Sequence, residues 1–277
     1  MNDDTEVTLT TAPEGKITGV PLKGQHALVT GASRGIGAAI AQTLARLGCN
    51  LTLVARDLGA LENQASKIAS AHGTTVQSQN ADIMNSEEVT TAFESAVAVN
   101  GVISILVNNA GSGKSAPFAR MERSLWDYML AINLTATFVC TQTALPGMLR
   151  AGYGRIVNIS STAGLTGYGY VTAYSAAKHG VVGLTRSLAM ETAAKGITVN
   201  AVCPGYTDTE MTRETVENIS AKTGRSAAES RTELTSANPQ GRLVQPWEVA
   251  ETVAWLALPG SAGITGQAIP IAGGEVM

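Results

Sequence analysis

Short runs of apolar and β-branched residues alternate with segments of helical period along most of the chain. The runs that predict strands are His26–Thr30, Leu51–Ala55, Thr75–Gln79, Ile103–Val107, Arg155–Ser160, Ile197–Cys203 and Ala268–Ile271. Most of them are apolar at successive positions, which is typical of strands covered on both faces in a parallel sheet. The pattern therefore predicts one Rossmann-like, doubly wound α/β domain, with seven parallel strands and helices on both faces.

The segment between the first two strands predicts the first helix. Ile36, Ile40, Leu44 and Leu47 recur at spacings of four, four and three, which places them on one apolar face, and Gly48 follows where a helix can end. Parallel strands joined by right-handed crossovers leave a crevice at their carboxyl ends, where ligands bind. We therefore expect the chemistry of this protein at that edge of the sheet.

Two segments depart from the alternation. Residues 1–22 lack convincing periodicity and predict a mobile arm before a dinucleotide-binding catalytic domain that spans residues 23–277. Residues 206–245 hold six acidic and five basic side chains, a higher charge density than the 15% of the whole chain. Such a segment predicts a solvated, lid-like insertion over the crevice.

Composition and charge remove several classes of protein. With 44% hydrophobic residues and 29 glycines in 277 positions, the chain is neither disordered, collagenous nor a coiled coil. A net charge of −3 provides no basic groove for nucleic acid. Three separated cysteines without a CxxC pair predict buried, reduced thiols and no metal site.

The chain also lacks the signals of secretion and of membrane insertion. The acidic segment Met1–Glu6 does not have the basic start of a secretory signal, so a cytoplasmic location is expected. The uncharged stretches Tyr128–Leu149 and Thr252–Gly274 are long enough to span a membrane, but polar residues interrupt the first, and prolines and glycines the second. Both predict buried elements of a soluble core.

The first chemical motif joins the first strand to the first helix. It reads Thr30-Gly31-Ala32-Ser33-Arg34-Gly35-Ile36-Gly37. Its three glycines permit a tight turn and the close approach of a pyrophosphate to the helix N-terminus, where free N–H groups favour negative charge. The spacing Gly-x-x-x-Gly-x-Gly differs from the commoner Gly-x-Gly-x-x-Gly fingerprint, so it supports dinucleotide binding without establishing it.

The end of the second strand bears on the choice of dinucleotide. An acid at this point usually binds the ribose 2′-hydroxyl of NAD(H), whereas an arginine can bind the 2′-phosphate of NADP(H). Arg56 follows Ala55 there, and Arg34 of the glycine loop can approach the same group, which favours NADP(H). NAD(H) remains open because the carboxylate of Asp57 could turn inward and both arginines could be plain surface charges.

The catalytic candidates are Tyr174 and Lys178, which share one face of a helix four residues apart. An isolated pair of this kind would be weak evidence. Here Ser161 ends a strand, Asn133 lies on the intervening helix, and Asn108-Asn109-Ala110-Gly111 ends another strand, so all of them are expected around the same crevice.

These residue types suit the reduction of a ketone, which needs a hydride at carbon and a proton at oxygen. Tyr174 can supply the proton, and we expect the ammonium of Lys178 and the charge of an oxidised nicotinamide to favour its phenolate. Ser161 is placed to donate a hydrogen bond to the substrate oxygen, an effect that a single donor of this kind shows at about 3 kcal/mol.

In this order, the motifs resemble the short-chain dehydrogenase/reductase family in its compact single-domain branch, over about Leu22 to Gly274. The resemblance implies that Asp82, of the pair Asp82-Ile83, meets the adenine, that Asn109, Ala110 and Gly111 line the cofactor, and that Pro204-Gly205 flanks the nicotinamide. It also implies that Lys178 holds the nicotinamide ribose and that Asn133 anchors a water that leads protons to solvent. The remaining matching positions are Thr207 and Thr209.

The substrate is less well defined. The chain is similar to 3-oxoacyl thioester reductases and 3-hydroxyacyl-CoA dehydrogenases, with aryl or cyclic secondary-alcohol dehydrogenases as the alternative within the family. A cofactor-sensing module without turnover, or a scaffold, are alternatives of other classes. Candidate pocket residues are Ser112, Ser115, Tyr168, Tyr170 and Tyr206.

The partners expected of this chain follow from its charges and its helices. Arg213, Lys222, Arg225 and Arg231 could meet the phosphates of a CoA or carrier arm, although the interspersed acids favour a plain solvated lid. Apolar helices around Leu125–Leu149 and Ala173–Leu188 favour a symmetric homo-oligomer, which the resemblance implies is a tetramer. Neither a nucleic-acid nor a membrane partner is expected.

Overall fold

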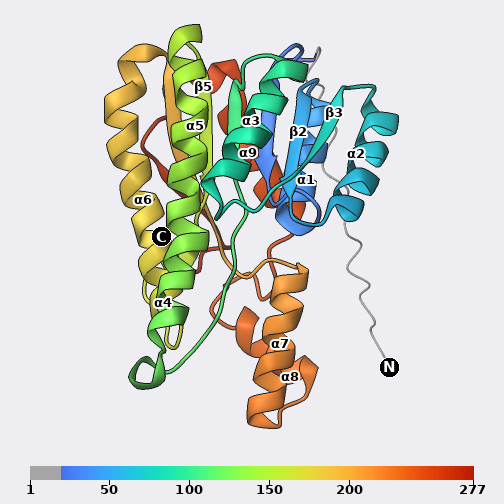
Figure 1. Cartoon of the computed structure of the whole chain (residues 1–277). Helices are drawn as coiled ribbons and strands as arrows, with labels where there is room; N and C mark the ends of the chain where they lie inside the picture. Colours follow the sequence, from blue (N-terminus) through green and yellow to red (C-terminus); the bar gives the residue numbers. More distant parts are fainter. Residues whose placement is uncertain (1–19) are drawn as a thin grey trace.

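All seven predicted strands pair in parallel in one sheet, in the order β3-β2-β1-β4-β5-β6-β7 (Figure 1). The structure is a computed structural model and describes residues 20–277. The strands are β1 His26–Thr30, β2 Asn50–Ala55, β3 Val76–Asn80, β4 Ile105–Asn108, β5 Gly154–Ile159, β6 Ile197–Pro204 and β7 Ala268–Ile271. The predicted fold is confirmed, and the predicted strand ends differ from the observed ones by one or two residues at most.

Helices cover both faces of the sheet. The helices are α1 Gly35–Arg46, α2 Leu58–His72, α3 Ser86–Asn100, α4 Arg123–Leu130, α5 Ala136–Ala151, α6 Thr172–Thr192, α7 Glu210–Thr223, α8 Ala227–Thr235 and α9 Pro246–Ala257. The core residues of α1, α2 and α9 form one buried cluster with the strands, and those of α3 to α6 form a second. These two cores make a three-layer sandwich whose carboxyl strand ends stay open.

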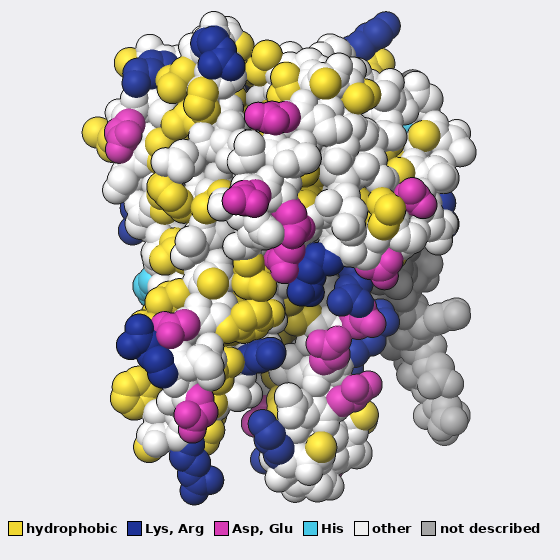
Figure 2. Space-filling view, in the orientation of Figure 1, with side chains coloured by type: hydrophobic (Ala, Val, Ile, Leu, Met, Phe, Trp, Pro, Cys, Tyr) yellow, Lys and Arg dark blue, Asp and Glu magenta, His cyan; other side chains and the backbone are white. Residues whose placement is uncertain are grey.

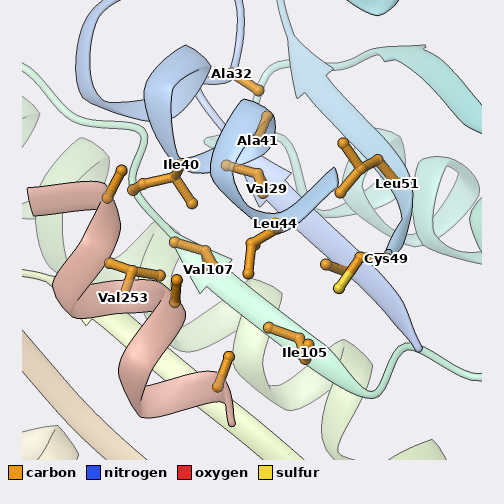
Figure 3. Close-up of a cluster of buried hydrophobic side chains, with 14 of the residues drawn as sticks. Val29, Ala32, Ile40, Ala41, Leu44, Cys49, Leu51, Ile105, Val107 and Val253 are labelled. Atoms are coloured by element: carbon orange, nitrogen blue, oxygen red, sulfur yellow. The ribbon is translucent and has the colours of Figure 1, made fainter. Parts of the chain in front are cut away.

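The core under α1 shows why the predicted apolar stripe forms a helix. Ile40 and Leu44 are fully buried and lie against the sheet strands and Val253 of α9 (Figure 3). Gly48 follows the helix with φ +94°, a conformation that glycine adopts without strain. Burying such side chains, each at roughly 1.5–3 kcal/mol, fixes α1 on the sheet. The glycine loop that precedes α1 is therefore held in place.

The N-terminal boundary differs from the prediction. Residues 1–19 of the predicted arm lie outside the described residues. Leu22, which was placed in the arm, is fully buried, and its N–H donates to the carbonyl oxygen of Leu47 at 3.0 Å. The folded body therefore begins before residue 23, because Leu22 closes the end of the core beneath α1.

The charged segment 206–245 contains α7 and α8, which extend as a lobe beyond the carboxyl edge of the sheet (Figure 1). Two of its four candidate phosphate-binding cations form ion pairs within the segment, Arg225 with Glu233 and Arg231 with Asp208. These pairs favour a self-neutralised surface over a dedicated anion site, as the mixture of charges suggests.

The helix Arg123–Ala151 is long and apolar enough to cross a membrane by length and composition alone. In this fold it packs on the sheet face beside α3 and α6, and 44% of its apolar window is buried. The sequence interpretation of this stretch as a core element therefore agrees with its position.

A buried histidine lies at the opposite, amino edge of the sheet. Nδ1 of His26 contacts the carbonyl oxygen of Gly101 at 2.8 Å, and Nε2 contacts the hydroxyl of Thr52 at 2.9 Å. A neutral imidazole satisfies both contacts by donating through Nδ1 and accepting through Nε2. Burial lowers the pKa of His26, because it disfavours the charged form more than the Gly101 contact favours it. Sequence patterning gave no role to this residue.

The first prediction concerns this histidine and the pH dependence of stability. Because its folded pKa lies below its unfolded value, its contribution to the free energy of unfolding is full above about pH 6.5 and declines as the pH falls below that value. The free energy of unfolding, measured with urea, should differ between pH 7.5 and pH 5. We expect His26→Gln to make this difference smaller by roughly 1 kcal/mol. The exposed His179 provides the control, since His179→Gln should keep the wild-type slope. Equal slopes in all three proteins would contradict the assignment.

Candidate active site

The loops at the carboxyl ends of β1, β4, β5 and β6 meet at one edge of the sheet, next to the first turns of α6 and to α7. Figure 2 shows a cleft on this side, between the lower end of the α4 column and the α7–α8 lobe, with hydrophobic side chains on its walls. The residues predicted from sequence to form the site lie in distant segments of the chain, and the fold brings them together at this edge of the sheet.

The glycine loop is built around backbone contacts that exclude side chains. Gly31 and Gly35 have φ values of +65° and +55°. A Cβ at Gly37 would overlap the carbonyl oxygen of Gly31 and would lie 2.5 Å from Nδ2 of Asn109. The first turn of α1 carries neither an acidic residue nor a side-chain cap. Its N–H groups are thus available to an anion, as a pyrophosphate site requires.

Asn109 ties the end of β4 to this loop. Its Nδ2 donates to the carbonyl oxygens of Thr30 at 2.9 Å and Gly31 at 3.2 Å. The backbone N–H of Ala110 donates to the hydroxyl of Thr30 at 3.1 Å. Asn109 and Ala110 therefore shape the loop from below.

One of the two open questions at the end of β2, the direction of the Asp57 carboxylate, finds a structural answer. Oδ1 of Asp57 accepts a hydrogen bond from the backbone N–H of Ala60 at 3.0 Å and caps α2. This carboxylate is committed to the helix, so it does not turn inward. Arg56 is exposed and, among residues 20–277, forms no salt bridge. Arg34 pairs with Glu210 at the start of α7.

Asp82 and Ile83 follow β3, as the resemblance requires. Oδ1 of Asp82 accepts from the backbone N–H of Met84 at 2.9 Å, which fixes the turn. Ile83 is 7% exposed and belongs to the core cluster under α3. The buried side chain of Ile83 anchors this loop in the core and thereby holds Asp82 at the end of β3.

Ser161 lies beside Tyr174 because a short 3-10 turn, Thr162–Gly164, packs tightly on α6. A Cβ at Gly164 would come within 2.7 Å of the carbonyl oxygen of Lys178. Oγ of Ser161 accepts from the backbone N–H of Ala163 at 3.1 Å, which leaves its own proton free to donate. A hydrogen bond with Ser161 lowers the pKa of Tyr174, but burial raises that pKa by more.

Lys178 is buried below Tyr174. Its Nζ donates to the carbonyl oxygen of Ile159 at 2.9 Å and lies 5.6 Å from the centre of the Tyr174 ring. Burial lowers the pKa of Lys178 to about 8. Burial of the phenol is the largest influence on the pKa of Tyr174 and raises it. The expectation that the Lys178 ammonium and an oxidised nicotinamide favour the phenolate stays a prediction.

Asn133 occupies a π-helical turn, Ala131–Thr135, between α4 and α5. Its Oδ1 accepts from the backbone N–H of Ser112 at 3.2 Å, and its Nδ2 donates to the carbonyl oxygen of Met129 at 3.1 Å. A Cβ at Gly111 would lie 2.6 Å from Oδ1 of Asn133 and 3.6 Å from Nζ of Lys178. Gly111 therefore lets the asparagine and the lysine approach the same point, and π-turns often mark such sites.

The segment after β6 closes the site. Pro204 is the last residue of β6, and the N–H of Gly205 donates to the carbonyl oxygen of Ile271 at 3.0 Å. The hydroxyl of Thr207 donates to the carbonyl oxygen of Gly205 at 3.0 Å. A Cβ at Gly35 would lie 3.3 Å from Cγ2 of Thr209, so the start of α7 lies over the glycine loop.

The five pocket candidates divide into two groups. Ser112 is held by Asn133, and Tyr168 is partly buried. Ser115, Tyr170 and Tyr206 are exposed, and Tyr170 has φ +68°, a strained value for a tyrosine. Sequence reasoning missed Glu275, whose carboxylate accepts a hydrogen bond from Tyr168. The one signal for it is the glycine pair just before it.

Across the described part of the chain, no three His, Cys, Asp or Glu side chains gather as a metal site would require. The three cysteines are free and buried.

Comparisons with known proteins agree with this geometry. A model of the short chain dehydrogenase family matches residues 25–220. The 3-oxoacyl-(acyl-carrier-protein) reductase of Aquifex aeolicus is 37% identical over 92% of this chain and 98% of that protein. The D-beta-hydroxybutyrate dehydrogenase of Cupriavidus necator is 37% identical over 92% of this chain and 99% of that protein.

A solved structure gives the same result at the level of the fold. A variant of actinorhodin polyketide ketoreductase, crystallised with NADPH, superposes with a TM-score of 0.87 at 40% identity, covering 91% of this chain and 97% of that one.

Proposed function

Because the chain belongs to the short-chain dehydrogenase family, we propose that it is an NADP(H)-dependent oxidoreductase that interconverts a ketone and a secondary alcohol. The observation that carries this proposal is the meeting of Ser161, Tyr174 and Lys178 at the mouth of the sheet, beside the glycine loop. A cofactor-sensing module would need the loop but not this cluster.

The described residues fit a dinucleotide phosphate. The uncapped first turn of α1 and the bare glycines provide a cradle for the pyrophosphate, with Ser33 and Ile36 as further loop contacts. Arg56 and Arg34 would hold the 2′-phosphate, and the commitment of Asp57 to its helix cap removes the competing acid. The loop residues between Asn109 and Gly111 and the segment Pro204–Thr209 would border the rest of the group. We propose that the α7–α8 lobe acts as the lid over it.

When bound, the coenzyme supplies or accepts the hydride. Tyr174, kept as a phenol by burial, donates its proton to the developing alkoxide oxygen. Ser161, whose Oγ accepts from Ala163, donates a second hydrogen bond through its own proton to the same oxygen, which stabilises the charge as it forms.

Lys178 and Asn133 support this proton transfer. With a pKa of about 8, Lys178 can both hold and release a proton near neutral pH, and it lies within reach of the Tyr174 ring. Asn133, which meets Lys178 at Gly111, would order a water that returns protons from solvent. In this assignment Tyr174 is the acid, Ser161 the oxyanion donor, and Lys178 and Asn133 the relay.

A 3-oxoacyl thioester is the substrate class we favour. It is supported by two relatives of similar chain length, one named as a 3-oxoacyl reductase and one as a ketoreductase. An aryl or cyclic secondary alcohol is the alternative within this reaction class.

We also propose that the protein is a cytoplasmic homo-oligomer. The thiols are free and buried, which suits a reducing compartment, and apolar side chains such as Phe138, Leu149 and Met190 are exposed on α5 and α6, which suits an interface between subunits.

The proposed function is tested with the full chain and NADPH, by following the absorbance of the coenzyme with a neutral 3-oxo ester, a 3-oxoacyl thioester and an aryl ketone. Turnover of the first two supports the proposal, and binding without turnover of any ketone contradicts it.

The same assay tests the phosphate site. We expect Arg56→Asp to lower the ratio of kcat/KM for NADPH to that for NADH by at least about 10-fold, because a cation near the 2′-phosphate is replaced by an anion. The matched control is Arg150→Asp at the far end of α5, which should leave the ratio unchanged. A ratio that stays constant in Arg56→Asp would show that Arg56 does not meet the phosphate.

A further inference from the structure

The chain after β7 turns back over the catalytic edge of the sheet. Gly273 and Gly274 have φ values of +61° and +96°, and the N–H of Glu275 donates to the carbonyl oxygen of Ala272 at 3.1 Å. This tight turn requires positive φ at both central positions, so the two glycines determine the path. It brings the carboxylate of Glu275 to Gly205, where a Cβ would lie 2.8 Å from Oε2.

The turn is also fixed from the side of the α7–α8 lobe. A Cβ at Gly273 would overlap the amide of Asn238, and one at Gly274 would lie 3.3 Å from Cγ of Pro239. Asn238 is itself buried and donates to the carbonyl oxygen of Arg242 at 2.8 Å. The segment from Gly273 to Glu275 therefore packs between the α7–α8 lobe and the end of β6. These contacts give Glu275 a defined position.

A hydrogen bond joins Glu275 to Tyr168, one of the pocket candidates. The hydroxyl of Tyr168 donates to Glu275, and burial together with that carboxylate raises the pKa of Tyr168 to about 12. Tyr168 is thus a neutral donor at every physiological pH. Its hydroxyl also interacts with Thr162, the residue after Ser161.

Two carboxylates, those of Glu275 and Glu233, act on the pocket candidate Tyr206. Burial and, to a smaller extent, the phenol of Tyr206 raise the pKa of Tyr174. Burial, followed by the carboxylates of Glu275 and Glu233, raises the pKa of Tyr206. Within residues 20–277, Glu233 forms an ion pair with Arg225, whereas Glu275 forms no salt bridge and its carboxylate accepts a hydrogen bond from the uncharged Tyr168. Of these two carboxylates, Glu275 is therefore the one without an ion pair in the described part of the chain.

We propose that Glu275 is a specificity-determining residue, whose carboxylate selects ketones that are uncharged near the carbonyl and rejects ketones that carry an anion there. This inference rests on the proposed function and narrows it: esters and thioesters of 3-oxo acids are accepted, and the free 3-oxo acids are not. Like charges held in one partly buried site repel each other more strongly than in water, and this repulsion provides the selection.

The test compares methyl 3-oxobutanoate with the 3-oxobutanoate anion, which share the ketone and differ in charge. In the wild-type protein we expect kcat/KM for the ester to exceed that for the anion by at least about 10-fold. In Glu275→Gln the amide can still accept from Tyr168, so activity on the ester should persist while kcat/KM for the anion rises about 10-fold.

Three further variants separate the charge from its surroundings. Glu233→Gln removes the neighbouring, paired charge and should change the ratio less than about 2-fold. Tyr168→Phe removes the hydrogen bond but keeps the charge, so discrimination against the anion should persist. Glu275→Ala also removes the charge but does not introduce an amide group. It should weaken the discrimination against the anion as much as Glu275→Gln does, which shows that the effect comes from loss of the charge.

The outcomes distinguish this inference from the proposed function. Reduction of the ester with an unchanged ester-to-anion ratio in both Glu275 variants would overturn the role of Glu275 and leave the proposed function standing. An equal change in Glu233→Gln would also overturn it, because the effect would then be a general one. Absence of wild-type turnover with every ketone would overturn the proposed function and this inference together.

Discussion

Tyr174→Phe is expected to lower kcat for ketone reduction by about 10³-fold or more, while the Kd for NADPH stays within a few fold of the wild-type value. The substitution removes one hydroxyl, which is the proton donor in the proposed reaction, and leaves the glycine loop and Lys178 in place. Stopped-flow and steady-state absorbance measure the rate, and quenching of NADPH fluorescence measures binding.

The matched control for this variant is Tyr153→Phe. The hydroxyl of Tyr153 is buried before β5 and has no hydrogen-bond partner within residues 20–277, so its loss leaves no group unsatisfied. We expect this control to retain wild-type kcat. If Tyr174→Phe kept a rate close to that of the control, another group would have to supply the proton and the mechanism would be wrong.

Gly37→Ala is expected to have the largest effect on stability, with a loss of about 3 kcal/mol or more and no measurable binding of NADPH. The new methyl group would overlap the carbonyl oxygen of Gly31 and lie 2.5 Å from Nδ2 of Asn109, and neither the backbone nor the clamped amide can move away. Urea unfolding gives the free energy, and fluorescence titration reports the coenzyme site.

Gly183→Ala provides the matched control, because Gly183 also lies in a helix but a Cβ there meets nothing within 4 Å. Alanine has the higher helix propensity, so this variant should be as stable as the wild type or more stable by up to about 1 kcal/mol. Similar losses in both variants would indicate that the close approach at Gly37 does not limit stability.

The fold and the order of the catalytic motifs could be predicted from sequence, because both depend on local patterns. The stripe that includes Ile40 and Leu44 defines α1, and runs such as Ile197–Cys203 are apolar on both faces as a covered strand must be. The spacing of Tyr174 and Lys178 places them on one helical face without any tertiary information.

The electrostatics of the site could not be predicted in this way. Burial of the phenol raises the pKa of Tyr174 by more than its hydrogen bond with Ser161 lowers it. Burial is a property of the packed structure, and a motif contains no measure of it. The same reason explains His26, whose partners at Gly101 and Thr52 come from other segments.

The commitment of Asp57 and the position of Glu275 required the structure for a different reason. Sequence left Asp57 with two roles, and only its bond to the N–H of Ala60 distinguishes them. Glu275 follows a glycine pair that predicts a turn but gives no direction for the tail. That direction comes from the contacts at Asn238 and Gly205.

The folded-back tail has a practical consequence for work on this protein. Glu275 stands two residues before Met277, so an affinity tag or fusion partner joined directly after Met277 would begin close to the hydrogen bond between Tyr168 and Glu275. Kinetic constants from such a fusion would mix the enzyme's own preferences with those of the added polypeptide. Tags for the experiments above therefore belong at the other end of the chain.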